Sequence, residues 1–496
     1  KIRKTSSKET FKSDPSKIET DSKERHDHIS RYYFFCIFAK QHRIRNKMKY
    51  TESKMSWERL LSSKRFGLER YHEERQHSRS DFQRDYDRLV FSAPFRRLQN
   101  KTQVFPLPGS VFVHNRLTHS LEVSCVGRSL GNNVSSVLLE RYSNEPWAGK
   151  LHGIGAIVAA ACLAHDMGNP PFGHSGERAI ATYFSEGNGL SLKNKLGTDE
   201  WKDLTHFEGN ANAFRLLTHQ FNGRRAGGFV MTYSTLASIV KYPYASNLAG
   251  ERGKFGFFTS EADDFVKVAD TLGMLRMDIS GIRYCRHPLV YLVEAADDIC
   301  YQVMDIEDAH KLKILTTEKT KELFLGFFSD SRLKHIQETL NIVSDINEQI
   351  AYLRSCVVGV LVDECSRIFC EREEELLKGE FDGVLMDHIG EIPRNAYKNC
   401  SDVAYEHIYK ASDVLDIELA GNRIISVLLD KLIDAVINPG KAYSQLLLNK
   451  VPGQYETRNE NIYKRIQAVI DYISGMTDVY ALDLYRKING MSLPAL

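Results

Sequence analysis

Apolar residues recur along most of this chain at the three- and four-residue steps of an amphipathic helix. One such stripe predicts a long helix that ends near Tyr142, and its members are Val123, Val126, Leu130, Val134 and Val137. The stretch from Ala156 to Ala164 is apolar on every face, so we expect a helix that is buried all round. A third helix is predicted after His287, because Pro288 is tolerated in a first turn.

Turn signals separate these helical segments. Gly168-Asn169-Pro170-Pro171 ends the buried helix, because proline cannot continue it. Between Asn247 and Thr259, glycines and the letters KFGFF predict a loop or a short strand pair. From about Leu315 onward, amphipathic helical segments dominate without a clear repeat. The pattern therefore predicts an all-α protein with at most a short β hairpin.

The first 47 residues differ from the rest in composition. They are polar and basic, and Met48 opens a stretch that resembles an ordinary start, so we expect residues 1–47 to be a disordered or non-native leader. A basic arm that contacts nucleic acid is the alternative. We expect residues 48–340 to form the core and residues 341–496 to form a C-terminal helical region.

Composition and charge narrow the class of protein. The net charge of +2 over 496 residues gives no global nucleic-acid signature. Nine cysteines without CxxC pairs argue for a reducing compartment and against a cysteine-ligated zinc site. Neither a secretory signal nor a membrane-length apolar run is present, so we expect a soluble, cytoplasmic protein without membrane contact.

Candidate metal chemistry begins at the end of the buried helix. His165 and Asp166 are costly there unless something pairs with them, and a divalent cation would satisfy both. His119 lies four residues before Val123 and therefore points to the same inward side, although a lone inward histidine is usually a hydrogen-bonded core residue. Asp297 lies in an apolar helical stretch. Two imidazoles and two carboxylates suit manganese, iron, zinc or a similar ion.

Other polar positions suggest further chemistry. His174 and Glu177 are three residues apart at the start of a helix, so they share a face as an acid/base pair. Asp297, Tyr301 and Asp305 form a stripe that faces a cation, sugar hydroxyls or solvent. The basic, amide-rich stretch from Arg96 to Pro106 is either a phosphate- or sugar-binding cluster or a solvated helix end. Glu418 and Arg423 are further candidates for ligand contact. The stretch from Ser474 to Asp478 is more typical of a helix junction.

The ordered set H…HD…D resembles the HD superfamily of metal-dependent phosphohydrolases. The stretches RRLQNKTQVFP, NRLTHSLEV, AHDMGNPPFGHSGE, HFEGNA and EAADDI together closely resemble the bacterial dGTPase (deoxyguanosinetriphosphate triphosphohydrolase) family. These matches run from about Arg96 to Asp308, and further likeness is present at ELAGNR and DYISGMTDVYALDLYR. Several long motifs in the right order are far more specific than a His-Asp pair alone.

This resemblance implies an all-helical HD fold that hydrolyses dGTP to deoxyguanosine and inorganic triphosphate. The family's metal ligands match His119, His165, Asp166 and Asp297, and its catalytic pair matches His174 and Glu177. Its phosphate and deoxyribose contacts match Gln103, Asn210, Lys241, Tyr242, Tyr301 and Asp305, to which we add Arg96. The purine segment matches Glu418 and Arg423, whereas the region after Leu446 departs too far for any base-reading arginine to be carried over.

The implied cofactor is a divalent ion, Mn²⁺ or Mg²⁺ first, with Fe, Co or Zn as alternatives. The resemblance also implies a homohexamer and single-stranded DNA as an effector. Release of intact triphosphate requires attack at the α-phosphorus, with His174 either activating water or protonating O5′. We expect Lys241 to hold phosphates because no GxxxxGK[ST] loop is present, Tyr301 to exclude a 2′-hydroxyl, and Glu418 to accept hydrogen bonds from guanine.

Two other readings stay open at this point. The first is an HD hydrolase of another nucleotide, either a broad dNTPase or an esterase of a signalling nucleotide. The second is a single-stranded nucleic-acid-binding regulatory protein with a vestigial HD site.

Overall fold

A computed structural model describes residues 54–69, 79–105, 113–278 and 281–491. The predicted leader, residues 1–47, lies outside the described residues. Apart from residues 382–384, the described residues belong to one compact unit, which is formed by Ser53–Phe381 and Leu385–Leu496. The predicted division of the chain at residue 340 stays a prediction.

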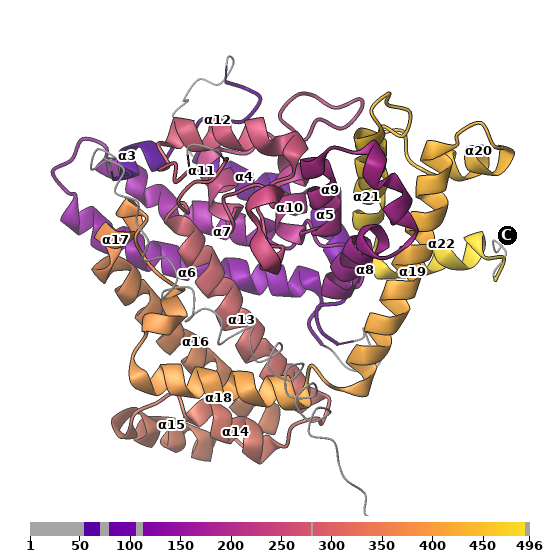
Figure 1. The fold of residues 1–496 in the computed structure, drawn as a ribbon. Helices are drawn as coiled ribbons and strands as arrows, with labels where there is room; N and C mark the ends of the chain where they lie inside the picture. Colours follow the sequence, from indigo (N-terminus) through magenta and orange to yellow (C-terminus); the bar gives the residue numbers. More distant parts are fainter. Residues whose placement is uncertain (1–53, 70–78, 106–112, 279–280, 492–496) are drawn as a thin grey trace, which may run out of the picture. The chain divides into compact units, whose positions relative to one another are not determined.

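Helices and short 3-10 turns make up the regular structure of the described residues, which contain no β-strand (Figure 1). The all-α prediction is therefore confirmed. Between Asn247 and Thr259 the chain forms 3-10 turns, and Ala245 pairs with Phe257 in a single parallel bridge instead of a hairpin. Among all the residues that the structure describes, no helix is long and apolar enough to cross a membrane.

Helices α6 (Arg116–Arg141) and α7 (Ile154–Ala164) pack side by side (Figure 1). The start of α6 is fixed by a capping box. The Asn115 side chain accepts a hydrogen bond from the Thr118 N–H at 3.0 Å, and Thr118 Oγ1 accepts one from the Asn115 N–H at 3.1 Å. The cap therefore positions the first turn of α6, which carries His119.

The buried stripe of α6 differs from the prediction at one position. Four predicted members are buried, namely Val123, Val126, Leu130 and Val134. Val137 is instead 41% exposed and Leu138 is buried, because four residues, and not three, return the helix to its buried face at this point. Gly131 allows α7 to approach closely, since a Cβ there would lie 2.8 Å from the Gly155 Cα.

Helix α7 is buried on nearly every face, as predicted, and within it only Ala156 is partly buried. Helix α13 (Leu289–Lys311) packs against α6, α7 and α16 (Ile346–Glu371). Helix α13 therefore meets α6 and α7, which lie far from it in the sequence, and each of these three helices carries or adjoins a predicted metal ligand.

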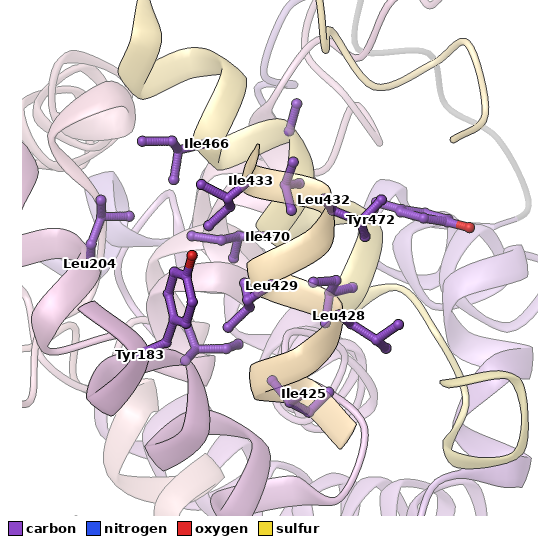
Figure 2. Close-up of a cluster of buried hydrophobic side chains, with 14 of the residues drawn as sticks. Tyr183, Leu204, Ile425, Leu428, Leu429, Leu432, Ile433, Ile466, Ile470 and Tyr472 are labelled. Carbon is purple, nitrogen blue, oxygen red and sulfur yellow. The ribbon is translucent and has the colours of Figure 1, made fainter. Parts of the chain in front are cut away.

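A second apolar cluster joins α8 (Gly173–Ser185) to α19 (Ser412–Ile437) and α21 (Ile462–Ser474). Figure 2 shows Tyr183 of α8 together with leucine and isoleucine side chains of α19 and α21. Each fully buried Leu or Ile contributes about 1.5–3 kcal/mol. This cluster therefore holds the C-terminal helices against α8, whose second residue is His174.

The remaining α-helices complete the unit. They are α3 (Trp57–Leu60), α4 (Asp81–Val90), α5 (Ala93–Arg97), α9 (Thr198–Thr205), α10 (Gly209–Thr218), α11 (Tyr233–Ile239), α12 (Ala262–Leu272), α14 (Thr317–Leu325), α15 (Asp330–Ile342), α17 (Glu373–Lys378), α18 (Glu391–His407), α20 (Ala442–Leu448) and α22 (Asp478–Ile488).

Candidate metal centre and hydrolytic site

The four predicted metal ligands come from three mutually packed helices. His119 lies in the first turn of α6, and Asp297 lies in α13. His165 and Asp166 directly follow α7. Because these helices pack against one another, His119 and Asp297 meet although they are 178 positions apart in the sequence.

The ligand atoms of these residues converge. His119 Nε2 lies 3.0 Å from Asp297 Oδ1, and His165 Nε2 lies 3.5 Å from the same oxygen. His165 Nε2 also lies 3.7 Å from Asp166 Oδ1, and the ligand atoms of His119, His165 and Asp166 all lie within 4.8 Å of one another. Atoms that share one cation at ~2.1 Å are about 3.0–3.4 Å apart in octahedral or tetrahedral geometry. The residues therefore fit a single divalent ion.

The hydrogen bonding of His165 supports a ligand role. Its Nδ1–H donates to the Cys162 carbonyl oxygen at 2.5 Å, so its Nε2 carries the lone pair. This Nε2 is buried and has no hydrogen-bond partner in the described part of the chain. A buried lone pair that faces two carboxylates is stabilised by a proton or by a cation.

The electrostatics keep both carboxylates ionised. Burial raises the pKa of Asp297, but His165 and His119 more than offset this effect and hold the pKa well below its usual value. Burial likewise raises the pKa of Asp166, but Arg116, whose Nη1 lies 2.8 Å from Oδ2, outweighs it and lowers the pKa. Burial lowers the pKa of His165, but the two carboxylates raise it to about 9. Ionised carboxylates are the form that binds cations.

The predicted catalytic pair lies in the first turn of α8. His174 Nδ1 lies 2.9 Å from Glu177 Oε2, and the Gly209 N–H donates to the other Glu177 oxygen at 2.9 Å. The His174 side chain is 56% exposed, whereas that of Glu177 is 9% exposed. Glu177 therefore orients the imidazole through Nδ1 and leaves Nε2 of His174 available for proton transfer.

Lys254 and Glu208, which the sequence analysis did not single out, lie close to Glu177. Burial raises the pKa of Glu177, but His174 and then Lys254 lower it, and the result is about 2. Lys254 Nζ also contacts Glu208 Oε2 at 2.5 Å. Gly209 is required here, because a Cβ would lie 2.4 Å from Glu177 Oε1. Glu208 lies within the HFEGNA stretch, whereas Lys254 lies in a loop without a local signal.

Lys241 belongs to an ion-pair group beside the metal ligands. Its Nζ lies 2.9 Å from Glu294 Oε1, and Arg286 Nη1 lies 3.0 Å from Glu294 Oε2. Burial lowers the pKa of Lys241, but Glu294 raises it well above its usual value, so Lys241 stays charged. The ring of Tyr242 lies 5.9 Å from Lys241 Nζ. Because Lys241 and Arg286 share the single negative charge of Glu294, this group has a net positive charge. It lies near Asp297, which follows Glu294 by three residues.

Tyr301 and Asp305 lie one turn apart on α13 and meet a residue that was not predicted. The rings of Tyr301 and Tyr409 stack with centroids 5.9 Å apart and planes at 26°. The Tyr409 hydroxyl donates to Asp305 Oδ2 at 2.7 Å. Burial raises the pKa of Asp305 to about 7, although the hydrogen bond from Tyr409 opposes this rise. Tyr409 follows α18 and carries no recognisable motif.

Glu418 and Arg423, which are predicted to contact the purine, have different surroundings in the structure. Glu418 of α19 forms a salt bridge with Arg178 of α8, and its carbonyl oxygen accepts a hydrogen bond from Ser175 Oγ at 2.8 Å. Glu418 is thus linked to the helix that carries His174 and Glu177. Arg423 and Arg96 are exposed, and no described contact joins either of them to another predicted site residue.

Two amide side chains complete the predicted set. Gln103 Oε1 is buried and lacks a hydrogen-bond partner among the residues that the structure describes. Asn210 Nδ2 donates to Glu208 Oε1 at 2.7 Å, and this bond connects Asn210 to the group around Glu177. Gln103 Oε1 can therefore accept a hydrogen bond from a ligand, whereas Asn210 Nδ2 already donates to Glu208.

The loop between the predicted metal ligands His165 and Asp166 and the predicted catalytic pair is fixed by contacts with the C-terminal region. Lys101 Nζ donates to the Asn169 carbonyl at 2.6 Å and to the Ser474 carbonyl at 2.7 Å. Asp478 accepts hydrogen bonds from the N–H groups of Thr102 at 2.8 Å and Phe172 at 2.9 Å. The predicted helix junction at Ser474 to Asp478 does separate α21 from α22, and it also holds this loop.

Comparison with protein families agrees with this geometry. Residues 116–241 match the HD domain model, and residues 393–487 match the model of the phosphohydrolase-associated domain. The helical fold and its His/Asp cluster therefore define an HD-domain phosphohydrolase.

Curated relatives narrow the class. A deoxyguanosinetriphosphate triphosphohydrolase-like protein of Synechocystis sp. is 38% identical over 463 residues, which cover 88% of this chain and 100% of the relative. A protein of the same name from Pseudomonas aeruginosa is 37% identical, with 89% and 100% covered. The deoxyguanosinetriphosphate triphosphohydrolase of Yersinia enterocolitica is 30% identical, with 82% and 93% covered. The chain belongs to the deoxyguanosinetriphosphate triphosphohydrolase family.

Proposed function

We propose that this protein hydrolyses dGTP to deoxyguanosine and inorganic triphosphate. The observation that carries the proposal is the convergence of His119, His165, Asp166 and Asp297, because four such groups can hold a cation where phosphate charge must be neutralised. The names of the relatives support dGTP as the substrate.

The four ligands are proposed to hold one divalent cation. Imidazole suits transition ions, whereas carboxylates suit magnesium and manganese, so Mn²⁺ matches both halves of the ligand set and Mg²⁺ is the next candidate. When bound, such an ion neutralises charge on the α-phosphate and lowers the pKa of water.

The reaction needs one proton to move in each direction. Water adds to the α-phosphorus and loses a proton, while the bond from that phosphorus to O5′ breaks and O5′ gains one. Nε2 of His174 is suited to either transfer, because Glu177 holds Nδ1 and stays ionised with a pKa of about 2.

Substrate recognition is assigned to the surrounding residues. Lys241 and Arg286 share Glu294, so one positive charge is left over for the β- and γ-phosphates. Tyr301, whose ring stacks on that of Tyr409, is proposed to pack against deoxyribose and to exclude a 2′-hydroxyl. In the C-terminal region, Glu418 would exchange Arg178 for guanine N1 and its amino group, and adenine cannot offer this donor pair.

The substrate and products can be tested directly. Each dNTP is incubated with the purified protein and Mn²⁺, and the phosphorus product is identified by ³¹P NMR. We expect inorganic triphosphate, formed fastest from dGTP, and no activity in His165→Ala. His152→Ala is the matched control, because this histidine is exposed and lies outside the site. Orthophosphate or pyrophosphate as the product would contradict the proposal, and equal rates with all four dNTPs would replace it with a broad dNTPase.

The acid/base pair can be tested separately from the metal centre. We expect His174→Ala to lower kcat by about 10²- to 10⁴-fold. Glu177→Gln should have a smaller effect, because the imidazole remains present but loses its ionised partner. Mn²⁺ affinity, measured by calorimetry, should be unchanged in both variants. A large loss of Mn²⁺ affinity in His174→Ala would assign this histidine to the metal instead.

The hexamer and the single-stranded DNA effector stay predictions.

A further inference from the structure

We propose that a cavity lined by Arg97, Lys101 and Arg224 binds a phosphate-class oxyanion. The cavity has a volume of about 140 Å³, and none of the predicted metal ligands lines it. A single water molecule needs about 10–15 Å³ on such a measure, so a group of several heavy atoms fits. This inference does not depend on the proposed reaction, because it concerns binding at a different place.

Arg97 is the first observation. It is the last residue of α5, and among the described residues its guanidinium has no hydrogen bond or ion pair with a carboxylate. Burial lowers its pKa, the hydroxyl of Tyr455 opposes that change, and the charge of Arg224 lowers the pKa further. A partly buried guanidinium beside another guanidinium is unfavourable unless an anion lies between them.

Arg224 is placed by a short turn whose ends are fixed. Its N–H donates to the Phe221 carbonyl at 3.0 Å, and the Asn222 N–H donates to the Gln454 carbonyl at 3.0 Å. The Arg224 guanidinium itself makes only a long contact of 3.5 Å, to Gln454 Oε1. The turn therefore holds a second guanidinium at the cavity without an acidic partner in the described residues.

The acidic residue that lines the cavity is already neutralised. Both oxygens of Asp471 accept hydrogen bonds from Arg215 at 2.8 Å. Lys101 adds a third cationic group, although its Nζ donates to two backbone carbonyls and burial lowers its pKa to about 7. The cavity thus has two or three positive charges and no available carboxylate among its lining residues.

Phosphate matches this arrangement better than a carboxylate does. Guanidinium groups form paired hydrogen bonds with phosphate oxygens, and a lysine adds a point charge. A tetrahedral oxyanion presents oxygens in several directions at once, as the separate guanidinium groups of Arg97 and Arg224 require. The ring of Phe221 and the side chain of Met167 also line the cavity, and such apolar groups strengthen ion pairing by excluding water.

Thermal unfolding gives the first test, with inorganic phosphate as the probe. In Tris-chloride buffer with Mg²⁺, Arg97→Gln should melt at the same temperature as the wild type or higher, because charge repulsion is removed. Added phosphate should raise the wild-type Tm by roughly 2–4 °C and leave Arg97→Gln nearly unchanged. A lower Tm of Arg97→Gln in both buffers, with an equal response to phosphate, would overturn the proposal.

Calorimetry then measures the affinity. We expect Arg97→Gln and Arg224→Gln each to bind inorganic phosphate about tenfold more weakly than the wild type. Arg225→Gln is the matched control, because its exposed arginine is the next residue and does not line the cavity. A parallel titration with deoxyguanosine monophosphate separates the sources of the phosphate group. Binding of either probe that requires Arg97 supports the site, whereas equal affinities in wild type and both variants would exclude it.

Discussion

Two clusters of charged residues in this protein both contain carboxylates but differ in how those carboxylates are paired. In the first, Arg215 donates to both oxygens of Asp471 at 2.8 Å and also pairs with Glu261. In the second, His165 Nε2 lacks a hydrogen-bond partner in the described residues, and Asp297 Oδ1 faces two imidazoles. In the first cluster a guanidinium pairs with both carboxylates, whereas in the second Arg116 pairs with Asp166 and no guanidinium in the described residues pairs with Asp297.

The difference separates a structural ion-pair network from a binding site. A guanidinium stays charged at every relevant pH, so Arg215 completes its cluster by itself. An imidazole, unlike a guanidinium, can lose its proton, so His119 and His165 do not give Asp297 a permanent cation. Convergent lone pairs of His165 and Asp297 that no guanidinium satisfies therefore indicate a cation site more reliably than burial or charge alone.

The largest expected effect is on activity. Asp297→Asn removes the carboxylate that both histidines face, and we expect dGTP hydrolysis to fall by about 10³-fold. The Tm should change little, because asparagine can still hydrogen bond to His119. Initial rates with Mn²⁺ measure the effect, and Asp263→Asn, at an exposed position, is the control. Unchanged hydrolysis in Asp297→Asn would remove the distinction between the two clusters.

The next effect is on stability. Arg215→Met leaves the carboxylates of Asp471 and Glu261 buried without their cation, which costs about 3–5 kcal/mol. We expect a markedly lower Tm but a nearly normal kcat at temperatures where the variant is folded. Adding Asp471→Asn to this variant should restore part of the Tm, because one uncompensated charge disappears. A variant that melts normally but is inactive would show that Arg215 acts on catalysis.

The smallest effect is a pH dependence at a third cluster. His114 lies 3.0 Å from Glu122 and 2.8 Å from Asp308. Burial lowers its pKa, but the two carboxylates raise it to about 10. Its stabilising contribution is therefore complete below the ordinary pKa of about 6.5 and is lost as the pH rises toward 10. The difference in Tm between the wild type and His114→Gln should therefore shrink across this pH range. A difference that does not depend on pH would show that His114 is uncharged.

Local sequence patterns were sufficient to predict the helices that carry or adjoin the predicted metal ligands. The apolar run of α7 and the stripe of α6 are properties of adjacent turns, so periodicity predicted both. The prediction was wrong at Val137 because steps of three and four residues are equally compatible with a helix until its neighbours are known. The ligand order H…HD…D was readable because each member lies on an apolar segment, where a charged residue stands out.

The surroundings of the site were not readable in the same way. Lys254, Tyr409 and Lys101 act through contacts across loops or between distant helices, and no spacing rule connects them to their partners. Arg286 reaches Glu294 from the segment before α13, so its role depends on a turn that periodicity does not specify. Such contacts depend on tertiary packing, which the one-dimensional pattern does not encode.

The tie between Thr102 and Asp478 spans 376 positions of the chain. Such a contact can form only after both of its ends have been synthesised, and closing the loop between them costs conformational entropy. A nascent chain still on the ribosome can assemble the three helices around His165 before α22 has been synthesised. The segment that leads to His174 is held by Asp478 through Phe172, so it can become fixed only after the start of the last helix has been synthesised.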